Sequence, residues 1–206
     1  MRLAITGAYG SGKSTLVRAA AERFGLRSSP LPAMQNPLGI EKPATHCTPA
    51  QLVELTVRRL VDRSDQEHGT HTVSDGSLVH DWVFAKTLLL HGTDPQVRPA
   101  PTIAGRGLVD GLLEPTRRAI RASLGIRYDV VVHLPVEFPM DEERPPVTEA
   151  FRARSDEYLA EELAAAGIRP HVLRGSVGDR LDQLHDLIVA DATRAHGRRH
   201  LTHSPT

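Results

Sequence analysis

The chain has 206 residues, with 25 basic and 25 acidic side chains, a hydrophobic fraction of 40% and one cysteine, Cys47. These values are typical of one ordinary globular domain, and they exclude a disordered or fibrous chain, a disulfide framework and a cysteine-rich metal site. The zero net charge and the aromatic content of 4% argue against a nucleic-acid partner. No apolar run reaches the roughly 18 residues of a membrane span, and residues 1–6 lack the features of a signal peptide. We therefore expect a cytoplasmic protein without a membrane partner, and the composition leaves an oligomer open.

Strands and helices are predicted to alternate along the chain. The expected strands lie at residues 1–6, at the start of the segment 26–47, and at 71–76, 128–135 and 169–175. The expected helices cover residues 12–24, 48–67, 77–91, 108–124 and 148–166 and begin again at 176, with a Pro/Gly loop over 92–107. This alternation indicates a three-layer α/β fold with a mostly parallel sheet, whose ligands bind at the carboxyl ends of the strands. We expect one domain over residues 1–196 with a lid region at about 137–155, and a disordered tail over 197–206 because Gly197 interrupts the last helix.

The most specific motif is the stretch GAYGSGKS at residues 7–14, which matches the phosphate-binding pattern G-x-x-x-x-G-K-[ST] at every fixed position. It lies between the first predicted strand and the first predicted helix, which argues against a glycine-rich turn that fits by chance. Glycines let the backbone N–H groups turn towards a phosphate, and the helix N-terminus adds positive charge. Lys13, one of only three lysines among 25 basic residues, is expected to reach the β- and γ-phosphates of ATP, and Ser14 to bind Mg²⁺. The predicted nucleotide-binding residues are Gly7, Ala8, Tyr9, Gly10, Ser11, Gly12, Lys13, Ser14 and Thr15.

An acid at the end of a neighbouring strand is needed to organise Mg²⁺. Asp75 fits best because it closes the strand at 71–76 and is followed by a glycine; the alternative is a capping role for the next helix. The strand at 128–135 ends without an acid, and its His133 is interpreted as a core residue. Asp81 is expected to be a surface or substrate-side residue.

Arginines after the strand at 128–135 are candidates to stabilise the transferring phosphoryl group. Arg144 and Arg152 are the predicted pair. Arg154 points away from Arg152 because residues two apart lie on different helix faces, so one of the two is expected to be solvated or paired with a glutamate. Arg106 is a further candidate for a substrate or phosphate contact. The arginines of the helix at 108–124, Arg117, Arg118 and Arg121, are expected to form a solvated helix face.

Three stretches of the sequence resemble one family. ITGAYGSGKSTLVRAAAERFG is similar to the opening of the small P-loop kinases, most closely the ribosylnicotinamide-kinase-like AAA group, and HTVSDGSLVHDWVFAKTLL resembles that group's third strand and following helix. VVVHLP, the arginine-containing lid region, AAAGIRP and HVLRGSVGDRLDQL with Arg180 resemble its C-terminal third. The resemblance spans most of residues 1–190, although only the phosphate loop is a specific motif.

The resemblance implies an ATP:alcohol phosphotransferase with strand order 2-3-1-4-5 and a substrate pocket roofed by the loops after strands two and three. Kinases of this group commonly carry an acid after the second strand, which binds the substrate hydroxyl and acts as the base. Here residues 28–36 hold no acid, and the next one is Glu41. Either Asp75 serves as both metal-site acid and base, or Glu41 supplies the base, or the chain lacks the activity.

The sequence therefore predicts an ATP- and Mg²⁺-dependent kinase that acts on a small hydroxylated molecule, with a nucleoside as the first choice. Lys13, Asp75, Arg144 and Arg152 are the predicted catalytic residues, and Ser14 and Asp75 the predicted metal-site residues. One alternative is an ATP-dependent switch or partner-binding ATPase. Another is a 5′-hydroxyl polynucleotide kinase, for which the basic run at 117–127 is the only candidate nucleic-acid channel.

Overall fold

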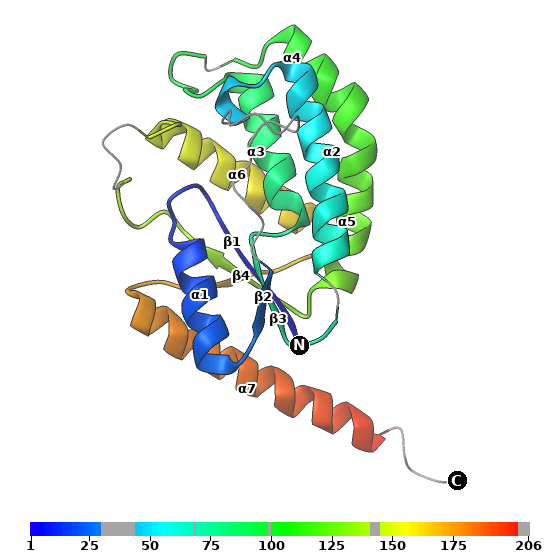
Figure 1. Ribbon diagram of the computed structural model, residues 1–206, viewed down its shortest axis with the longest axis vertical. Helices are drawn as coiled ribbons and strands as arrows, with labels where there is room; N and C mark the ends of the chain where they lie inside the picture. The colour runs from blue at the N-terminus through cyan, green and yellow to red at the C-terminus, as the bar shows by residue number, and fades with distance from the viewer. Residues whose placement is uncertain (30–43, 68, 99, 141–144, 202–206) are drawn as a thin grey trace.

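The computed structural model describes residues 1–29, 44–67, 69–98, 100–140 and 145–201, excluding the side chains of residues 29, 192 and 194–201. Two candidates from the sequence, Glu41 and Arg144, lie outside these described residues. The elements along the chain are β1 (Arg2–Gly7), α1 (Lys13–Phe24), β2 (Arg27–Ser29), a 3₁₀ turn (Ala44–His46), α2 (Pro49–Gln66), β3 (Thr72–Asp75), α3 (Leu78–His91), α4 (Ile103–Leu108), a π-helical turn (Val109–Leu113), α5 (Glu114–Arg127), β4 (Val130–Leu134), α6 (Glu149–Ala165), β5 (His171–Val172) and α7 (Val177–Leu201) (Figure 1).

The five strands form one parallel sheet in the order β2-β3-β1-β4-β5. This confirms the expected fold class and strand order. Since all strands run the same way, their carboxyl ends share one edge, and β1 lies between β3 and β4 at that edge. The loop that leaves β1 is therefore flanked by the ends of two other strands, which is the usual position of a ligand site in an open α/β sheet.

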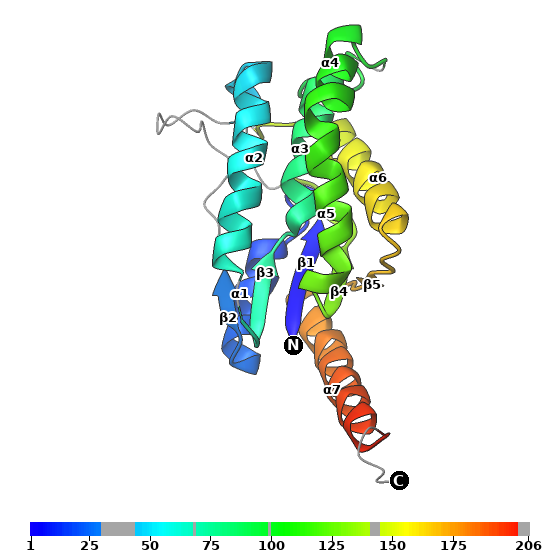
Figure 2. The same ribbon diagram turned by 90° about the vertical axis from the view of Figure 1, so that its right-hand side faces the viewer.

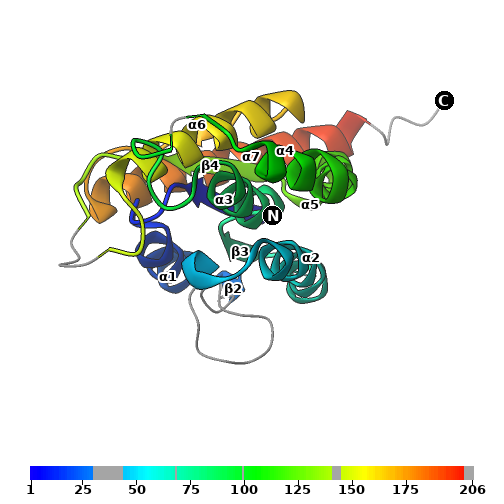
Figure 3. The same ribbon diagram turned by 90° about the horizontal axis from the view of Figure 1, so that it is seen from above.

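Two apolar cores cover the two faces of the sheet. In β1, Leu3 and Ile5 point into the core shared with α1 and α7, whereas Ala4 points into the core shared with α2, α3, α5 and α6. This alternation is the period of two expected for a strand buried on both faces. Helix α3 is central in its layer, with α2, α5 and α6 packed around it (Figures 2 and 3). The molecule thus has the three expected layers, helix, sheet and helix.

Two boundaries differ from the sequence prediction. The expected loop over 92–107 ends early, because Thr102 caps α4 by accepting a hydrogen bond from the Gly105 N–H at 3.0 Å. At the other end, α7 continues through Gly197 to Leu201 and carries the chain away from the body of the molecule (Figure 1). A single glycine costs a helix only about 1 kcal/mol relative to alanine, which is too little to end it. The rest of the expected tail lies outside the described residues. No helix among those residues is long and apolar enough to span a bilayer.

Candidate phosphate-binding site

The loop between β1 and α1 is shaped by glycines with positive φ. Gly7 has φ 148° and Gly12, at the start of α1, has φ 90°. A Cβ atom at Gly7 would lie 2.5 Å from the Leu134 carbonyl oxygen and 2.6 Å from the Ser11 hydroxyl. Only glycine fits this position, because β1 and β4 bring the Leu134 backbone directly against the loop. The motif therefore adopts the tight turn at the start of a helix that phosphate-binding loops require.

Lys13 closes this loop on itself. Its Nζ donates a hydrogen bond to the Ala8 carbonyl oxygen at 2.6 Å. Burial lowers the pKa of the Lys13 ammonium from 10.5 to about 8, although the nearby carboxylates of Asp75 and Asp156 oppose that shift. Ser14, next along α1, is exposed.

Asp75 is the last residue of β3 and lies opposite Ile5 of β1, two residues before the loop begins. Its backbone oxygen accepts a hydrogen bond from Arg63 at 2.9 Å, which fixes the end of the strand. The residue at the N-cap of α3 is Ser77. The alternative that Asp75 caps this helix is therefore wrong; Asp75 is partly exposed, and its negative charge acts on the Lys13 ammonium.

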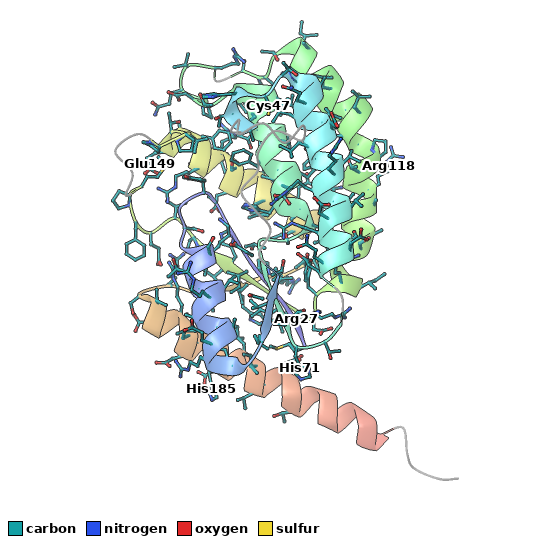
Figure 4. The ribbon with its side chains drawn as sticks, in the orientation of Figure 1. Arg27, Cys47, His71, Arg118, Glu149 and His185 are labelled. Atoms are coloured by element: carbon teal, nitrogen blue, oxygen red, sulfur yellow. The ribbon has the colours of Figure 1, made fainter. Side chains whose placement is uncertain are left out.

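Arg152 reaches the same loop from α6. Its side chain is fully buried, with Nε donating to the Tyr9 carbonyl oxygen at 2.7 Å and both Nη atoms donating to that of Phe138 at 3.1 Å. Glu149, labelled at the first turn of α6 in Figure 4, binds Nη1 through both carboxylate oxygens, the nearer at 2.7 Å. Arg154 instead points outwards and pairs with Glu157, as the spacing of two predicts. The structure thus brings Arg152 to the loop backbone; whether it also contacts a phosphoryl group stays a prediction.

A second arginine, Arg180 of α7, contacts the loop from the other side. Its Nη1 donates to the Ser11 carbonyl oxygen at 2.9 Å and its Nη2 to Glu137 at 2.9 Å. A cavity of about 250 Å³ opens beside it, and its walls come from the loop, from the chain after β4 and from the start of α7: Gly10, Ser11, Gly12, Thr15, Phe138, Gly175, Ser176, Val177 and Arg180. The sequence analysis named Arg180 only within the stretch that resembles the kinase family and assigned it no contact, because residue type alone does not show that one arginine among 22 reaches the loop.

Other predicted residues lie elsewhere. Asp81, expected at the surface or facing substrate, is buried on α3, where it accepts hydrogen bonds from Arg63 at 2.7 Å and Arg59 at 3.2 Å. Those arginines are one helical turn apart on α2, so both face α3. Arg106 is exposed on α4, at the end of the helical layer remote from α1 (Figure 1). The structure therefore does not place Arg106 at the phosphate-binding loop.

The arginines of α5 do not form the expected solvated face. Arg117 and Arg121 both bind the buried carboxylate of Glu162 in α6, at 3.0 and 2.7 Å, and only Arg118 is largely exposed. Packing of α5 against α6 explains the difference, because a buried carboxylate needs charged partners. Most arginines of the basic run at 117–127 therefore already bind partners within the protein.

His80, which the sequence analysis did not single out, lies in the first turn of α3 against Gly76. Burial, followed by the positive charge of Lys13, lowers the pKa of its imidazole to about 3. The ring is therefore neutral at physiological pH, with nitrogen atoms that can accept or donate a hydrogen bond close to the loop lysine.

The residues around the loop fit a nucleotide phosphate with its magnesium ion. Among the described residues, buried side-chain atoms without a hydrogen-bond partner include the Ser11 hydroxyl, which is in the loop, and Nε of Arg180, whose Nη1 donates to the loop backbone. Such orphaned polar atoms are uncommon unless a ligand or water satisfies them. Within the same described part of the chain, no three His, Cys, Asp or Glu side chains converge on a metal position. Mg²⁺ is typically held by one or two protein oxygens together with substrate phosphates, and Ser14 and Asp75 suit that arrangement.

No family model matches the chain, and no curated protein sequence does. Among solved structures, deoxyadenosine kinase from M. mycoides with bound dCTP is similar, with a TM-score of 0.65 and 16% identity over 92% of this chain and 100% of that chain. The YorR protein of Bacillus subtilis gives a TM-score of 0.51 at 13% identity, covering 94% of this chain and 98% of its own. The NadR protein in complex with NR gives 0.57 at 12% identity, over 90% of this chain and 50% of that one. These likenesses establish the small P-loop kinase-like fold.

Proposed function

We propose that the protein is a Mg²⁺- and ATP-dependent phosphotransferase that phosphorylates a hydroxyl group of a small metabolite, with a nucleoside as the first choice. The observation that carries the proposal is the glycine-shaped loop that holds Lys13 and follows β1, next to the end of β3, where Asp75 lies at the same carboxyl edge of the sheet. The likeness of the fold to a deoxyadenosine kinase structure supports a nucleoside acceptor. Such an enzyme would act in the cytoplasm, where ATP and Mg²⁺ are abundant.

The phosphates of ATP would lie against the loop amides and the N-terminus of α1. Lys13 would exchange the Ala8 carbonyl oxygen for the β- and γ-phosphate oxygens, which offer a full charge in place of a dipole. Ser14 and Asp75 would hold Mg²⁺, which when bound neutralises part of the phosphate charge. Arg152 and Arg144 remain the candidates for the transferring phosphoryl group; the contacts of Arg152 also suggest that it keeps the loop in shape.

The cavity beside Arg180 is the proposed position of the base of ATP. It continues from the loop residues that would hold the phosphates, and Phe138 and Val177 give it apolar walls. An apolar slot next to a phosphate loop suits a flat heteroaromatic ring. The acceptor would then approach from the α3 side, where Asp75 is the candidate base and the neutral imidazole of His80 can hydrogen-bond a hydroxyl group.

A small acceptor is favoured over a polynucleotide. Arg117 and Arg121 neutralise Glu162, and Arg118 pairs with Glu114, so the basic run of α5 does not form a continuous channel for phosphates. Nucleic-acid binding depends on several such contacts acting together.

A thermal-shift screen tests the proposal. Mg²⁺-ATP should raise the melting temperature of the protein, and the true acceptor should raise it further, because each ligand stabilises the folded state according to its concentration and affinity. A panel of nucleosides and sugars that adds nothing to the effect of Mg²⁺-ATP would argue for the ATP-dependent switch instead.

A further inference from the structure

Three segments of the chain form the cavity beside the phosphate loop. They are the loop itself, the connection that follows β4 and the turn between β5 and α7. The pairing of β4 with β5 extends to His133 and Val172, before either chain reaches the cavity. The separation of the cavity walls is therefore set by contacts that the chain makes after these strands end.

Glu137, which follows β4, connects all three segments. Its Oε2 accepts hydrogen bonds from the Gly175 backbone N–H at 3.0 Å and from Nη2 of Arg180 at 2.9 Å. Its Oε1 accepts one from Nη1 of Arg174 at 3.3 Å. Arg180 in turn donates through Nη1 to the Ser11 carbonyl oxygen at 2.9 Å. One carboxylate thus joins the connection after β4 to the turn before α7 and, through Arg180, to the phosphate loop.

The charge of Glu137 strengthens these contacts. The hydrogen bond from Arg180 lowers the pKa of the Glu137 carboxyl below its ordinary value, so the group is ionised at neutral pH. Hydrogen bonds between ionised partners are stronger than those between neutral groups. The Arg180 side chain is only 4% exposed, and a buried guanidinium needs a negative partner. Glu137 therefore holds Arg180 in place against the loop.

Phe138, the next residue along the chain, gives the cavity its aromatic wall. Its side chain is 52% exposed, so packing in the core does not fix its position. Its ring lies 5.7 Å from the Arg180 guanidinium, and its carbonyl oxygen accepts hydrogen bonds from Arg152 at 3.1 Å. The wall is therefore held by polar contacts on both sides, from Arg152 and from Glu137 with its partners.

We propose that Glu137 is a positioning residue for the nucleotide base, which keeps Phe138 and the turn at residues 175–177 at the separation that a flat ring requires. This inference rests on the proposed function, in which that cavity holds the base of ATP. Glu137 does not contact the nucleotide itself and acts through Phe138 and Arg180. Walls that are ordered before binding reduce the entropy that the ligand must otherwise pay to order them. A ligand without a base gains nothing from this order.

The test measures the affinities of the full chain for ATP and for inorganic tripolyphosphate, both with Mg²⁺, by calorimetry. Tripolyphosphate has the phosphates of ATP but no base. We expect Glu137→Ala to weaken ATP binding about five-fold and to change tripolyphosphate binding by less than about two-fold. Glu137→Gln keeps an oxygen that can accept the Gly175 N–H, so it should recover part of the lost ATP affinity.

A double substitution tests whether Glu137 acts through Phe138. Residues that contribute through one contact have effects that do not add. Once Phe138→Ala has removed the aromatic wall, adding Glu137→Ala should weaken ATP binding by less than about a further two-fold. A further five-fold loss in the double variant, equal to the loss in the single one, would show that the two residues act independently and would overturn the inference.

The matched control is Glu54→Ala. Glu54 is an exposed glutamate on α2 that pairs with Arg58 at 2.7 Å, so its loss should leave both affinities unchanged. Equal losses of ATP and tripolyphosphate binding in Glu137→Ala would indicate a structural role of Glu137 in the whole loop and would overturn the inference. If the unmodified protein bound neither ligand, the proposed function would fail and the inference with it. If it bound both ligands and Glu137→Ala bound them equally well, the inference alone would be overturned.

Discussion

Arg63 joins α2, α3 and the end of β3, and its replacement by methionine tests the account of how the site is held in place. The side chain is 2% exposed and donates to Asp81 at 2.7 Å, to Glu67 at 3.0 Å and to the Asp75 backbone oxygen at 2.9 Å. Methionine fills a similar length but removes the cation that two buried carboxylates share; within the described residues, Asp81 then keeps only Arg59 as a charged partner, and Glu67 keeps only hydroxyl donors. Removing one member of a buried ion pair costs about 3–5 kcal/mol, a large share of the roughly 5–15 kcal/mol that stabilises a domain.

The same substitution has a predicted pH signature. Burial would raise the pKa of the Asp81 carboxyl, but Arg63 and Arg59 outweigh it and lower that pKa from 3.8 to about 2. A carboxyl whose pKa is lower in the folded state stabilises the protein above its unfolded pKa, and this stabilisation is lost as the pH falls towards 2. The shift corresponds to a stabilisation on the order of 2 kcal/mol at neutral pH. In Arg63→Met, much of this acid sensitivity should disappear.

Urea unfolding at a series of pH values from about 3 to 7 measures both effects. The matched control is Arg118→Met, since Arg118 is an exposed arginine on α5 (Figure 4) that is 79% exposed and pairs with Glu114. We expect this control to lose less than about 1 kcal/mol. If Arg63→Met lost no more than Arg118→Met, or kept the full acid sensitivity of the unmodified protein, the reasoning would be refuted.

Two further substitutions test the phosphate loop and the adjoining cavity. Gly7→Ala places a Cβ atom 2.5 Å from the Leu134 carbonyl oxygen, and we expect it to abolish the thermal shift produced by Mg²⁺-ATP. The control is Gly107→Ala, where a Cβ atom meets nothing within 4 Å, and it should keep that shift. An intact shift in Gly7→Ala would contradict the described loop. Phe138→Ala removes the ring that lies 5.7 Å from the Arg180 guanidinium. Measured by calorimetry, the affinity for ATP should fall about five-fold, while the affinity for inorganic tripolyphosphate should stay unchanged. Equal losses for both ligands would argue against a base in that cavity.

The parts of the site that lie close together in sequence were predictable. The loop at residues 7–14 carries its own glycines and lysine, and its position after a strand determines where it lies in a parallel sheet. The position of Asp75 was predictable because a strand that ends in an acid and a glycine delivers that acid to the same edge; its role at a metal ion stays a prediction. These inferences need only local pattern and the rule that parallel strands end together.

The parts supplied by distant helices were not predictable from local pattern. Arg180 reaches the Ser11 backbone across 169 positions of the chain, and Asp156 of α6 comes within 3.4 Å of His133 in β4. Asp81 was misplaced for the same reason, since its environment depends on Arg59 and Arg63 of another helix. With 25 acidic and 25 basic residues in the chain, the residue type alone does not distinguish a buried pair from a surface charge.

The central claim, that the chain transfers a phosphoryl group from ATP to a small hydroxylated acceptor, is tested most directly by mass spectrometry of the products. The purified protein is incubated with ATP, Mg²⁺ and a panel of nucleosides, and each acceptor is examined for the mass of one added phosphoryl group. We expect one nucleoside or close relative to be phosphorylated, and Lys13→Met, which removes the ammonium beside the loop, to give no such product. Release of inorganic phosphate at the same rate with and without the panel, and with no phosphorylated acceptor, would contradict the account.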